Sequence, residues 1–415
     1  TSNPAALTWL GAYFDSFPDI KQMVSVAGTD YWAAGRSGLM TMNTTNPAVV
    51  SLRSTPIVPL PTGPHVVRQR GNTSVVLDYT LNVLRLFDYT LPEAQQLRST
   101  VSLPSGAELL ELADLSGGTV GLACVATQYG ASSITIIDIT NPAAPVVLST
   151  ISGFTASLMS ASGSRLYVFT TANDFKIIEL AQPLAPQIRS TTHFGGISSD
   201  YTCMTSWSNN AAAIGTTPFG LWLMDTTNAT APFVASIWNP VSGYRVNSVA
   251  KGTNYLYVSA TVGSTPTAIS DTRLESLNVA TITSPTLRFV DNSTSGTGYP
   301  GEFASLRYVS SPAAKFLVGV REDPNSFSTT PWLSNDLTIF ELPPGFLTNE
   351  GVPFPVATMD VPYGRGGIAP NADGSRFLLA GEEAGLYQVA MPASWAPGFG
   401  TRPFDQRPCI GGTAS

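Results

Sequence analysis

The sequence is poor in charged residues. Only 12% of its 415 residues are charged, which is about half the share found in an average soluble protein. The formal net charge is −7, and no basic run interleaved with aromatic residues occurs. Nucleic-acid binding needs such a basic surface, so we expect no nucleic-acid partner. No run of about 18 or more apolar residues occurs, so we expect no membrane insertion.

Histidine and cysteine are also scarce. The two histidines, His65 and His193, lie in different repeats, and most metal sites and nucleophile–base pairs need more. The three cysteines, Cys124, Cys203 and Cys409, are too few for a disulfide scaffold and fit no zinc spacing. We therefore predict no cofactor and assign no catalytic residue. Calcium is the one metal that acidic loops could hold here, without a specific motif.

The chain is rich in one repeated pattern. The stretch "ITIIDITNPAAPVVLST" from Ile134 is a β-branched run that ends at Asp138, turns at Asn141-Pro142 and begins a second apolar run. Related copies start at Leu39, Leu84, Phe175 and Leu221, and looser copies at Leu274, Leu337 and Leu386. A small polar turn and an apolar strand, such as "SASGSRLYVFT", precede most copies. Each period of 41 to 63 residues therefore holds about four short strands.

Four short strands per repeat are typical of one β-propeller blade. We therefore predict an all-β chain forming a single propeller of eight four-stranded antiparallel blades, with seven blades as the alternative. The last copy lacks a convincing fourth strand because Pro and Gly crowd residues 391–405. Residues 3–15 match the missing half of the repeat, so we expect them to close the last blade. The propeller spans 1–405, and 406–415 form a C-terminal tail.

The repeat resembles the LVIVD-repeat group of β-propellers, whose unit reads roughly Leu-Val-Ile-Val-Asp, then Asn-Pro, then Pro and a strand. The match is good in the copies from Leu39 to Leu221 and covers most of the chain as architecture. The resemblance implies a secreted or surface protein and names no catalytic residue. The chain starts at Thr1 without Met, which is expected of a mature form whose leader has been removed.

An acidic residue or Asn recurs at the end of the first run of each copy. We expect its side-chain oxygen to accept backbone N–H groups of the following turn, which is a structural role rather than metal binding. These residues are Asn43, Asp88, Asp138, Glu179, Asp225, Asn278 and Glu341.

Two long connections, residues 262–274 and 321–336, are expected between the second and third strands of the sixth and seventh blades. Long loops on a rigid scaffold commonly bind ligands, and both should emerge on one face. An exposed Trp among acids suits a carbohydrate, and the acids alone suit calcium. The candidate binding residues are Asp271, Arg273, Arg321, Glu322, Asp323 and Trp332.

Four Asn-x-Ser/Thr sequons are candidates for N-glycosylation: Asn43, Asn72, Asn228 and Asn292. All fall at expected turns. Asn72 falls between first and second strands, and Asn43 and Asn228 fall between third and fourth strands. These three turns share the face opposite the two long loops. We therefore expect the loop face to meet a partner and the sequon face to meet solvent.

These features favour an extracellular or cell-surface structural or adhesion module, a building block of a surface, matrix or filament glycoprotein with protein partners. The alternative is a carbohydrate-active hydrolase or lyase, or a lectin. A cluster of acids and arginines at the centre of the ring would favour an enzyme. Cys124 and Cys203 are separated by a whole blade, so we predict that they are not bonded to each other.

Overall fold

The computed structural model describes the strands and many of their connections. The described residues are 22–26, 29–33, 39–43, 51–54, 64–70, 73–78, 81–88, 97–114, 121–128, 132–194, 200–217, 219–263, 269–291, 303–310, 315–321, 335–342, 353–361, 368–370, 376–381 and 385–390. Within these ranges, the 3-10 turn η3 (Ser208–Asn210) is the one helical element. None of the described helical structure is long and apolar enough to span a bilayer.

The strands form eight antiparallel sheets, and strands adjacent in the sequence are adjacent in the sheet. The first four sheets contain β1 (Gln22–Val26), β2 (Thr29–Ala33), β3 (Leu39–Asn43) and β4 (Ser51–Ser54); β5 (Pro64–Arg70), β6 (Thr73–Asp78), β7 (Val83–Asp88) and β8 (Leu97–Ser102); β9 (Ala107–Asp114), β10 (Gly121–Thr127), β11 (Ser133–Asp138) and β12 (Val146–Ser152); β13 (Ala156–Ser162), β14 (Arg165–Thr170), β15 (Asp174–Glu179) and β16 (Gln187–His193).

The last four sheets follow the same plan. They contain β17 (Asp200–Trp207), β18 (Ala211–Thr217), β19 (Gly220–Asp225) and β20 (Phe233–Trp238); β21 (Tyr244–Lys251), β22 (Tyr255–Gly263), β23 (Ile269–Asn278) and β24 (Thr286–Asp291); β25 (Phe303–Ser310), β26 (Lys315–Arg321), β27 (Asn335–Leu342) and β28 (Phe354–Val361); β29 (Ile368–Pro370), β30 (Arg376–Gly381) and β31 (Gly385–Ala390).

The two middle strands of each sheet carry the apolar runs seen in the sequence. All seven residues of β10 are buried, and so are five of the six residues of β14. Both faces of a middle strand pack against a neighbouring sheet, so its residues are apolar on both sides rather than alternating. The outer strand β12 has no fully buried residue, which is the pattern of a strand at the rim.

The cores lie between successive sheets. In one cluster, Cys124 and Ile136 of the third sheet pack with Leu166 and Val168 of the fourth. Similar clusters join the second sheet to the third, the fourth to the fifth, the fifth to the sixth and the sixth to the seventh. A single sheet cannot bury its own faces, so each one depends on its neighbours for stability.

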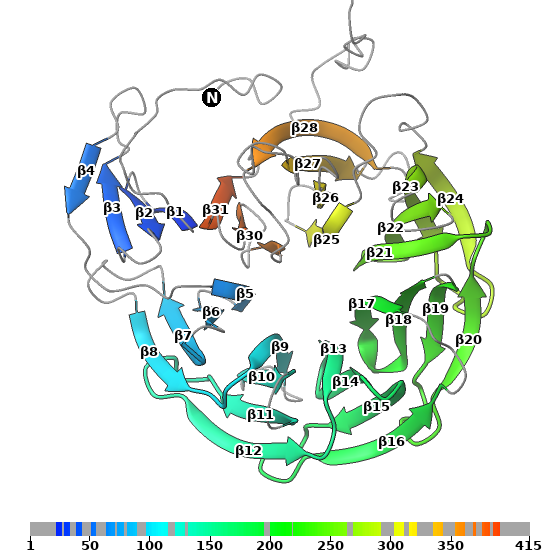
Figure 1. The fold of residues 1–415 in the computed structure, drawn as a ribbon, viewed down its shortest axis with the longest axis horizontal. Helices are drawn as coiled ribbons and strands as arrows, with labels where there is room; N and C mark the ends of the chain where they lie inside the picture. The colour runs from blue at the N-terminus through cyan, green and yellow to red at the C-terminus, as the bar shows by residue number, and fades with distance from the viewer. Residues whose placement is uncertain are drawn as a thin grey trace, which may run out of the picture.

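The sheets are arranged around a centre, and the first strands of the second to seventh sheets lie nearest to it (Figure 1). From β5 through β9, β13, β17, β21 and β25 to β29, each first strand contacts the next, and β29 also contacts β5. Seven sheets therefore surround the centre. The first sheet lies outside them, with β1 beside β31 at the edge of the eighth sheet (Figure 1).

The structure confirms an all-β propeller built from repeated four-stranded antiparallel units. Eight sheets are present, and the eighth has three strands among the described residues, as the weak last repeat predicted. The expected closing strand, residues 3–15, lies outside the described residues. The described neighbour of β31 is β1.

Candidate functional site

The first strands of the second to seventh sheets share one irregularity. Near its start, each has a register shift against the second strand, so that one residue has no direct partner. The bulge occurs near the start of all six strands, so it gives a shared reference point from which equivalent positions can be counted. The third residue after the bulge occupies the same position in every strand. These equivalent residues are Arg68, Glu111, Ser160, Thr205, Ala250 and Arg307, and we call this set the inner ring.

All the charge in the inner ring lies on one side of it. Arg68 and Glu111 come from the neighbouring strands β5 and β9, and Arg307 comes from β25. Only the short strand β29 separates β25 from β5 around the centre. Residues 68, 111 and 307 are far apart in the sequence, and the ring brings them to one arc.

The three charged side chains interact. Arg68 Nη2 donates to Glu111 Oε1 at 2.7 Å, and each of these side chains is 20% exposed. Burial lowers the pKa of Arg307 to about 10, the charge of Arg68 lowers it further, and the charge of Glu111 opposes both. A guanidinium normally keeps its proton far above neutral pH. The lowered pKa of Arg307 therefore reflects its burial first and the positive charge of Arg68 second.

The inner ring does not contain the pair of carboxyl groups that cutting a glycosidic bond requires. Retaining and inverting glycosidases use two carboxyl groups, one on each side of the bond. In the inner ring, Glu111 is the one carboxylate, and it is already bound to Arg68. Across the described part of the chain, no group of three His, Cys, Asp or Glu residues could hold a metal ion.

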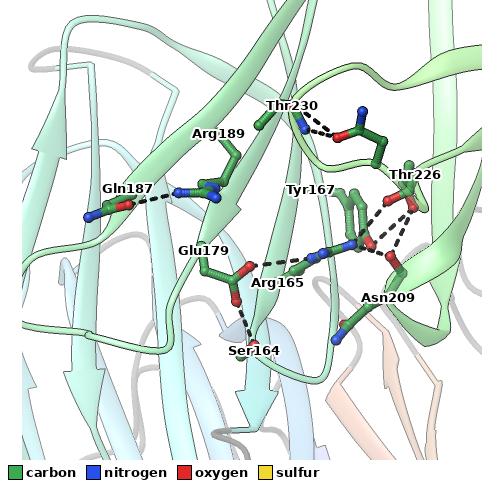
Figure 2. Close-up of polar contacts among 10 residues, drawn as sticks. Ser164, Arg165, Tyr167, Glu179, Gln187, Arg189, Asn209, Thr226 and Thr230 are labelled. Carbon is green, nitrogen blue, oxygen red and sulfur yellow. Dashed lines mark hydrogen bonds and ion pairs between the residues drawn. The ribbon is translucent and has the colours of Figure 1, made fainter.

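A second network joins the fourth and fifth sheets (Figure 2). Arg165 Nη1 donates to the carbonyl oxygens of Thr226, at 3.0 Å, and Asn209, and its Nε lies 3.4 Å from Glu179 Oε2. Ser164 Oγ donates to the other oxygen of Glu179 at 2.6 Å. Because Arg165 of the fourth sheet donates to two carbonyl groups of the fifth, this network helps to fix the position of the two sheets relative to each other.

The recurring acid has the expected role in three copies. The side-chain oxygens of Asp138, Asp225 and Asn278 each accept the backbone N–H two residues later, at 2.8 to 2.9 Å. Glu179 differs, because its longer side chain reaches Ser164 and Arg165 instead of its own turn. The side chains of Asn43 and Glu341 lie outside the described set.

One of the two expected binding loops is mostly strand. β22 continues to Gly263 and β23 begins at Ile269, with Val262 paired to Asp271. Asp271 and Arg273 therefore lie in β23 and not in a loop. Arg321 ends β26, where it pairs with Asp336. Glu322, Asp323 and Trp332 lie outside the described residues, so the second loop and its Trp are untested.

The β22–β23 hairpin holds a buried carboxylate that the sequence did not reveal. Glu275 is 1% exposed. Its Oε2 accepts hydrogen bonds from Trp238 Nε1 and from Tyr244 OH, both at 2.9 Å. Burial, followed by the charge of Glu275, raises the pKa of Tyr244 well above its usual value, while the charge of Arg273 lowers it. Tyr244 therefore stays protonated and able to donate.

The remaining candidates are dispersed. His193 is exposed, and its Nδ1 lies 2.9 Å from Asp174 Oδ1.

Cys124 and Cys203 are free thiols, which confirms that they are not bonded to each other. Asn228 is exposed in the β19–β20 turn, where its Oδ1 accepts the N–H and hydroxyl of Thr230. Asn43 ends β3. Asn72, Asn292, Cys409 and the side chain of His65 lie outside what the structure describes.

Comparisons with known proteins identify a fold and no family. No family model matches the chain, and no curated protein matches it. Among solved structures, hydrazine synthase of Kuenenia stuttgartiensis matches with a TM-score of 0.56 and 13% identity, over 79% of this chain and 96% of that one. A chain of the mitotic checkpoint complex gives 0.52 and 12%, over 79% and 87%. The WD40 repeats of RRP9 give 0.52 and 9%, over 75% and 84%. These likenesses support the β-propeller fold alone.

Proposed function

We propose that this propeller is a structural building block of an extracellular or cell-surface glycoprotein assembly, in which copies of the chain associate through the outer rim. One observation carries the proposal. Six of the large apolar side chains that are exposed lie on the outermost strands of four successive sheets. They are Val146 and Val147 of β12, Ile188 of β16, Phe233 and Ile237 of β20, and Leu287 of β24.

Exposed apolar side chains that cluster on one surface commonly mark a protein interface. These strands also end their sheets, so their outer edges have backbone groups that are not paired within the sheet. Soluble proteins usually protect such edges with charged residues. β12 and β20 contain no charged residue at all. The rim therefore offers apolar contact area and free hydrogen-bonding groups together.

The extracellular part of the proposal rests on the LVIVD resemblance and on the exposed sequon at Asn228. Its Oδ1 is used by the turn, and a glycan on its amide nitrogen would project from the tip of a hairpin. Peptide mapping of the protein from its natural source should find a glycan at Asn228. An unmodified Asn228 together with an intracellular location would contradict this part.

Sedimentation velocity over a wide concentration range tests the assembly. The wild type should form oligomers, and the double variant Val147→Lys/Phe233→Lys should remain monomeric. Leu81→Lys is the matched control, because Leu81 is 49% exposed but lies between β6 and β7, away from the rim. A wild type that stays monomeric up to about millimolar concentration, well above the Kd of a specific interface, would overturn the proposal.

A carbohydrate-active enzyme or a lectin is the second candidate, and the charged inner ring is the observation that favours it. Incubation with acidic oligosaccharides distinguishes the two classes. Turnover that Glu111→Gln abolishes would support an enzyme, and saturable binding without turnover would support a lectin.

A further inference from the structure

We propose that the rim contact joins two unlike edges of the propeller, so that β24 of one copy, with Arg288 and Leu287, docks on β12 of the next copy beside Asp138 and Val146. This inference rests on the proposed assembly. It names the two surfaces that meet and the way in which the assembly grows.

The first surface is the basic edge, formed by Arg288 and Leu287 of β24. Arg288 is exposed, and it makes no hydrogen bond or ion pair with any residue that the structure describes. The third strand of its sheet ends in the neutral Asn278. The one acid of β24, Asp291, is the last residue of the strand and lies three residues further on, roughly 10 Å along it. Leu287 is 41% exposed, so the basic edge offers a guanidinium beside apolar surface.

The second surface is the acidic edge, formed by Asp138 together with Val146 and Val147. Asp138 pairs with Val146 across β11 and β12, so the two side chains are neighbours. Thr140 donates its N–H and its hydroxyl to Asp138 Oδ1, at 2.8 and 2.5 Å, and thereby holds the carboxylate in place. None of the hydrogen bonds within the described chain uses Asp138 Oδ2. Val146 and Val147 are 54% and 50% exposed.

Each edge is complementary to the other and not to itself. Two copies that met through the same edge would bring Arg288 toward Arg288, or Asp138 toward Asp138, and like charges repel. Unlike edges instead bring a guanidinium to a carboxylate, with Leu287 against Val146. A guanidinium and a carboxylate form one of the stronger polar pairs in proteins.

A contact between unlike edges is heterologous, so each copy keeps one edge free for a further copy. β12 and β24 lie on different sides of the ring, with the sheets of β16 and β20 between them (Figure 1). The assembly therefore grows beyond a dimer, into a ring or a filament of copies.

The fifth sheet carries a similar acid, but it is the poorer acceptor. Asp225 occupies the position of Asp138 and pairs with Phe233. Phe233 is exposed and the next residue, Val234, is half-buried, whereas both valines at the start of β12 are exposed. The turn after Asp225 also contains Asn228, where the glycan expected from the proposed function would obstruct a partner. The turn after Asp138 contains no sequon.

Sedimentation velocity of charge variants tests the contact. Arg288→Asp and Asp138→Arg should each raise the apparent Kd of association by at least about 10-fold, because each puts like charges together. The double variant Arg288→Asp/Asp138→Arg exchanges the two charges, so its Kd should return to within about 3-fold of the wild type. Urea denaturation of each variant checks that the fold is kept.

Asp138→Asn keeps the test decisive if Asp138→Arg folds poorly. Asn278 shows that Asn can hold this turn, because its Oδ1 accepts the Ala280 N–H at 2.9 Å. Asp138→Asn should associate more weakly than the wild type. Mixed with an equal amount of Arg288→Asp, it should form 1:1 pairs that do not grow, because one intact contact joins the two variants.

Two matched controls should associate as the wild type does. Asp225→Asn changes the equivalent acid of the fifth sheet. Arg189→Gln changes the residue at the equivalent bulge of β16, whose Nη1 already donates to Gln187.

The outcomes separate this contact from the proposed assembly. A wild type that stays monomeric would overturn both. A wild type that assembles while Arg288→Asp associates equally well would overturn the contact alone. The contact would also be wrong if the folded double variant did not regain association, if the mixture formed no pairs, or if Asp225→Asn lost as much as Asp138→Asn.

Discussion

Ser149 on the outer strand β12 donates a hydrogen bond of 2.6 Å from its Oγ to the carbonyl oxygen of Pro183, which lies in the β15–β16 turn of the next sheet. The same bond recurs at the same position of the repeat, from Ser99 to Pro142 at 2.7 Å and from Ser236 to Ile282 at 2.5 Å. The Ser at this position of the repeat therefore links successive sheets at the rim.

Replacing this serine should weaken the link between two sheets. We expect Ser149→Ala to lower the free energy of unfolding by about 0.5–1.5 kcal/mol, because the Pro183 carbonyl loses its partner. Ser190→Ala is the matched control. Ser190 holds the equivalent position on β16, but its Oγ is buried without a hydrogen-bond partner among the described residues. This control should change stability by less than about 0.5 kcal/mol. Equal losses in urea denaturation would contradict the role of the bond.

The fold could be predicted from the sequence because its local signals repeat. Each copy carries an apolar run, an acid or Asn, and a Pro-bearing turn, and these features belong to neighbouring residues. The turn chemistry of Asp138 follows from the same local pattern. The four-stranded repeat, the β-propeller architecture and the separation of Cys124 from Cys203 all depend on this periodicity, and the structure confirms them.

The candidate site could not be found in the same way. Arg68, Glu111 and Arg307 lie outside the repeated motif, and each looks like an ordinary polar residue in its own strand. Only a structural alignment of "HVVRQR", "AELLEL" and "FASLRY" on their bulges puts them in one column. A bulge depends on pairing with the next strand, which sequence periodicity does not register.

The expected loop at 262–274 was wrong for a related reason. Its Gly, Ser, Thr and Pro content is typical of turns, yet Thr261 pairs with Thr272 and Val262 pairs with Asp271. β-branched Thr and Val tolerate an extended hairpin well. Pairing between β22 and β23 therefore extends into both ends of the expected loop, which composition alone does not reveal.

The two described cysteines should be unreactive in the folded protein. Burial raises the pKa of Cys203 to about 12 from 9.0, although the Thr202 hydroxyl and the Gly215 backbone lower it. Burial, and then the charge of Glu111, also raises the pKa of Cys124. At pH 8 the Cys203 thiolate population should fall by about 1,000-fold.

Iodoacetamide labelling followed by peptide mass spectrometry tests this expectation. Both cysteine peptides should stay unmodified in the native protein and become modified in guanidinium chloride, which serves as the internal control. Native Cys203 that reacts as fast as the denatured thiol would show that its environment is open to solvent.

Gly220 should tolerate substitution far less than Gly153. Both have positive φ, +81° and +97°, which disfavours any side chain. A Cβ at Gly220 would also lie 2.2 Å from the carbonyl oxygen of Trp238, whereas a Cβ at Gly153 would meet nothing within 4 Å. We expect Gly153→Ala to cost about 1–2 kcal/mol and Gly220→Ala to cost more than about 3 kcal/mol. Similar losses in a denaturant titration would contradict the close approach of β19 to β20.

The Tyr244–Glu275 pair should give the protein a specific sensitivity to alkali. Because the folded-state pKa of Tyr244 is raised above its ordinary value of 10.0, the unfolded state loses this proton first as the pH rises. Tyr244 therefore contributes full stability below about pH 10, and the free energy of unfolding should fall above it by up to about 1.4 kcal/mol per pH unit.

Tyr244→Phe separates this effect from the other groups that titrate in the same range. The variant should lose about 1.5–3 kcal/mol at neutral pH, because Glu275 keeps one donor instead of two. Its stability should fall less steeply than that of the wild type above pH 10, and contributions from Arg307 and the cysteines cancel in the difference. Trp238→Phe is the control, because it removes the other donor to the same oxygen but keeps the Tyr244 hydroxyl. It should lose stability at neutral pH and retain the wild-type slope in alkali. Parallel alkaline slopes for wild type and Tyr244→Phe in urea titrations would show that Tyr244 does not donate to a buried, charged Glu275.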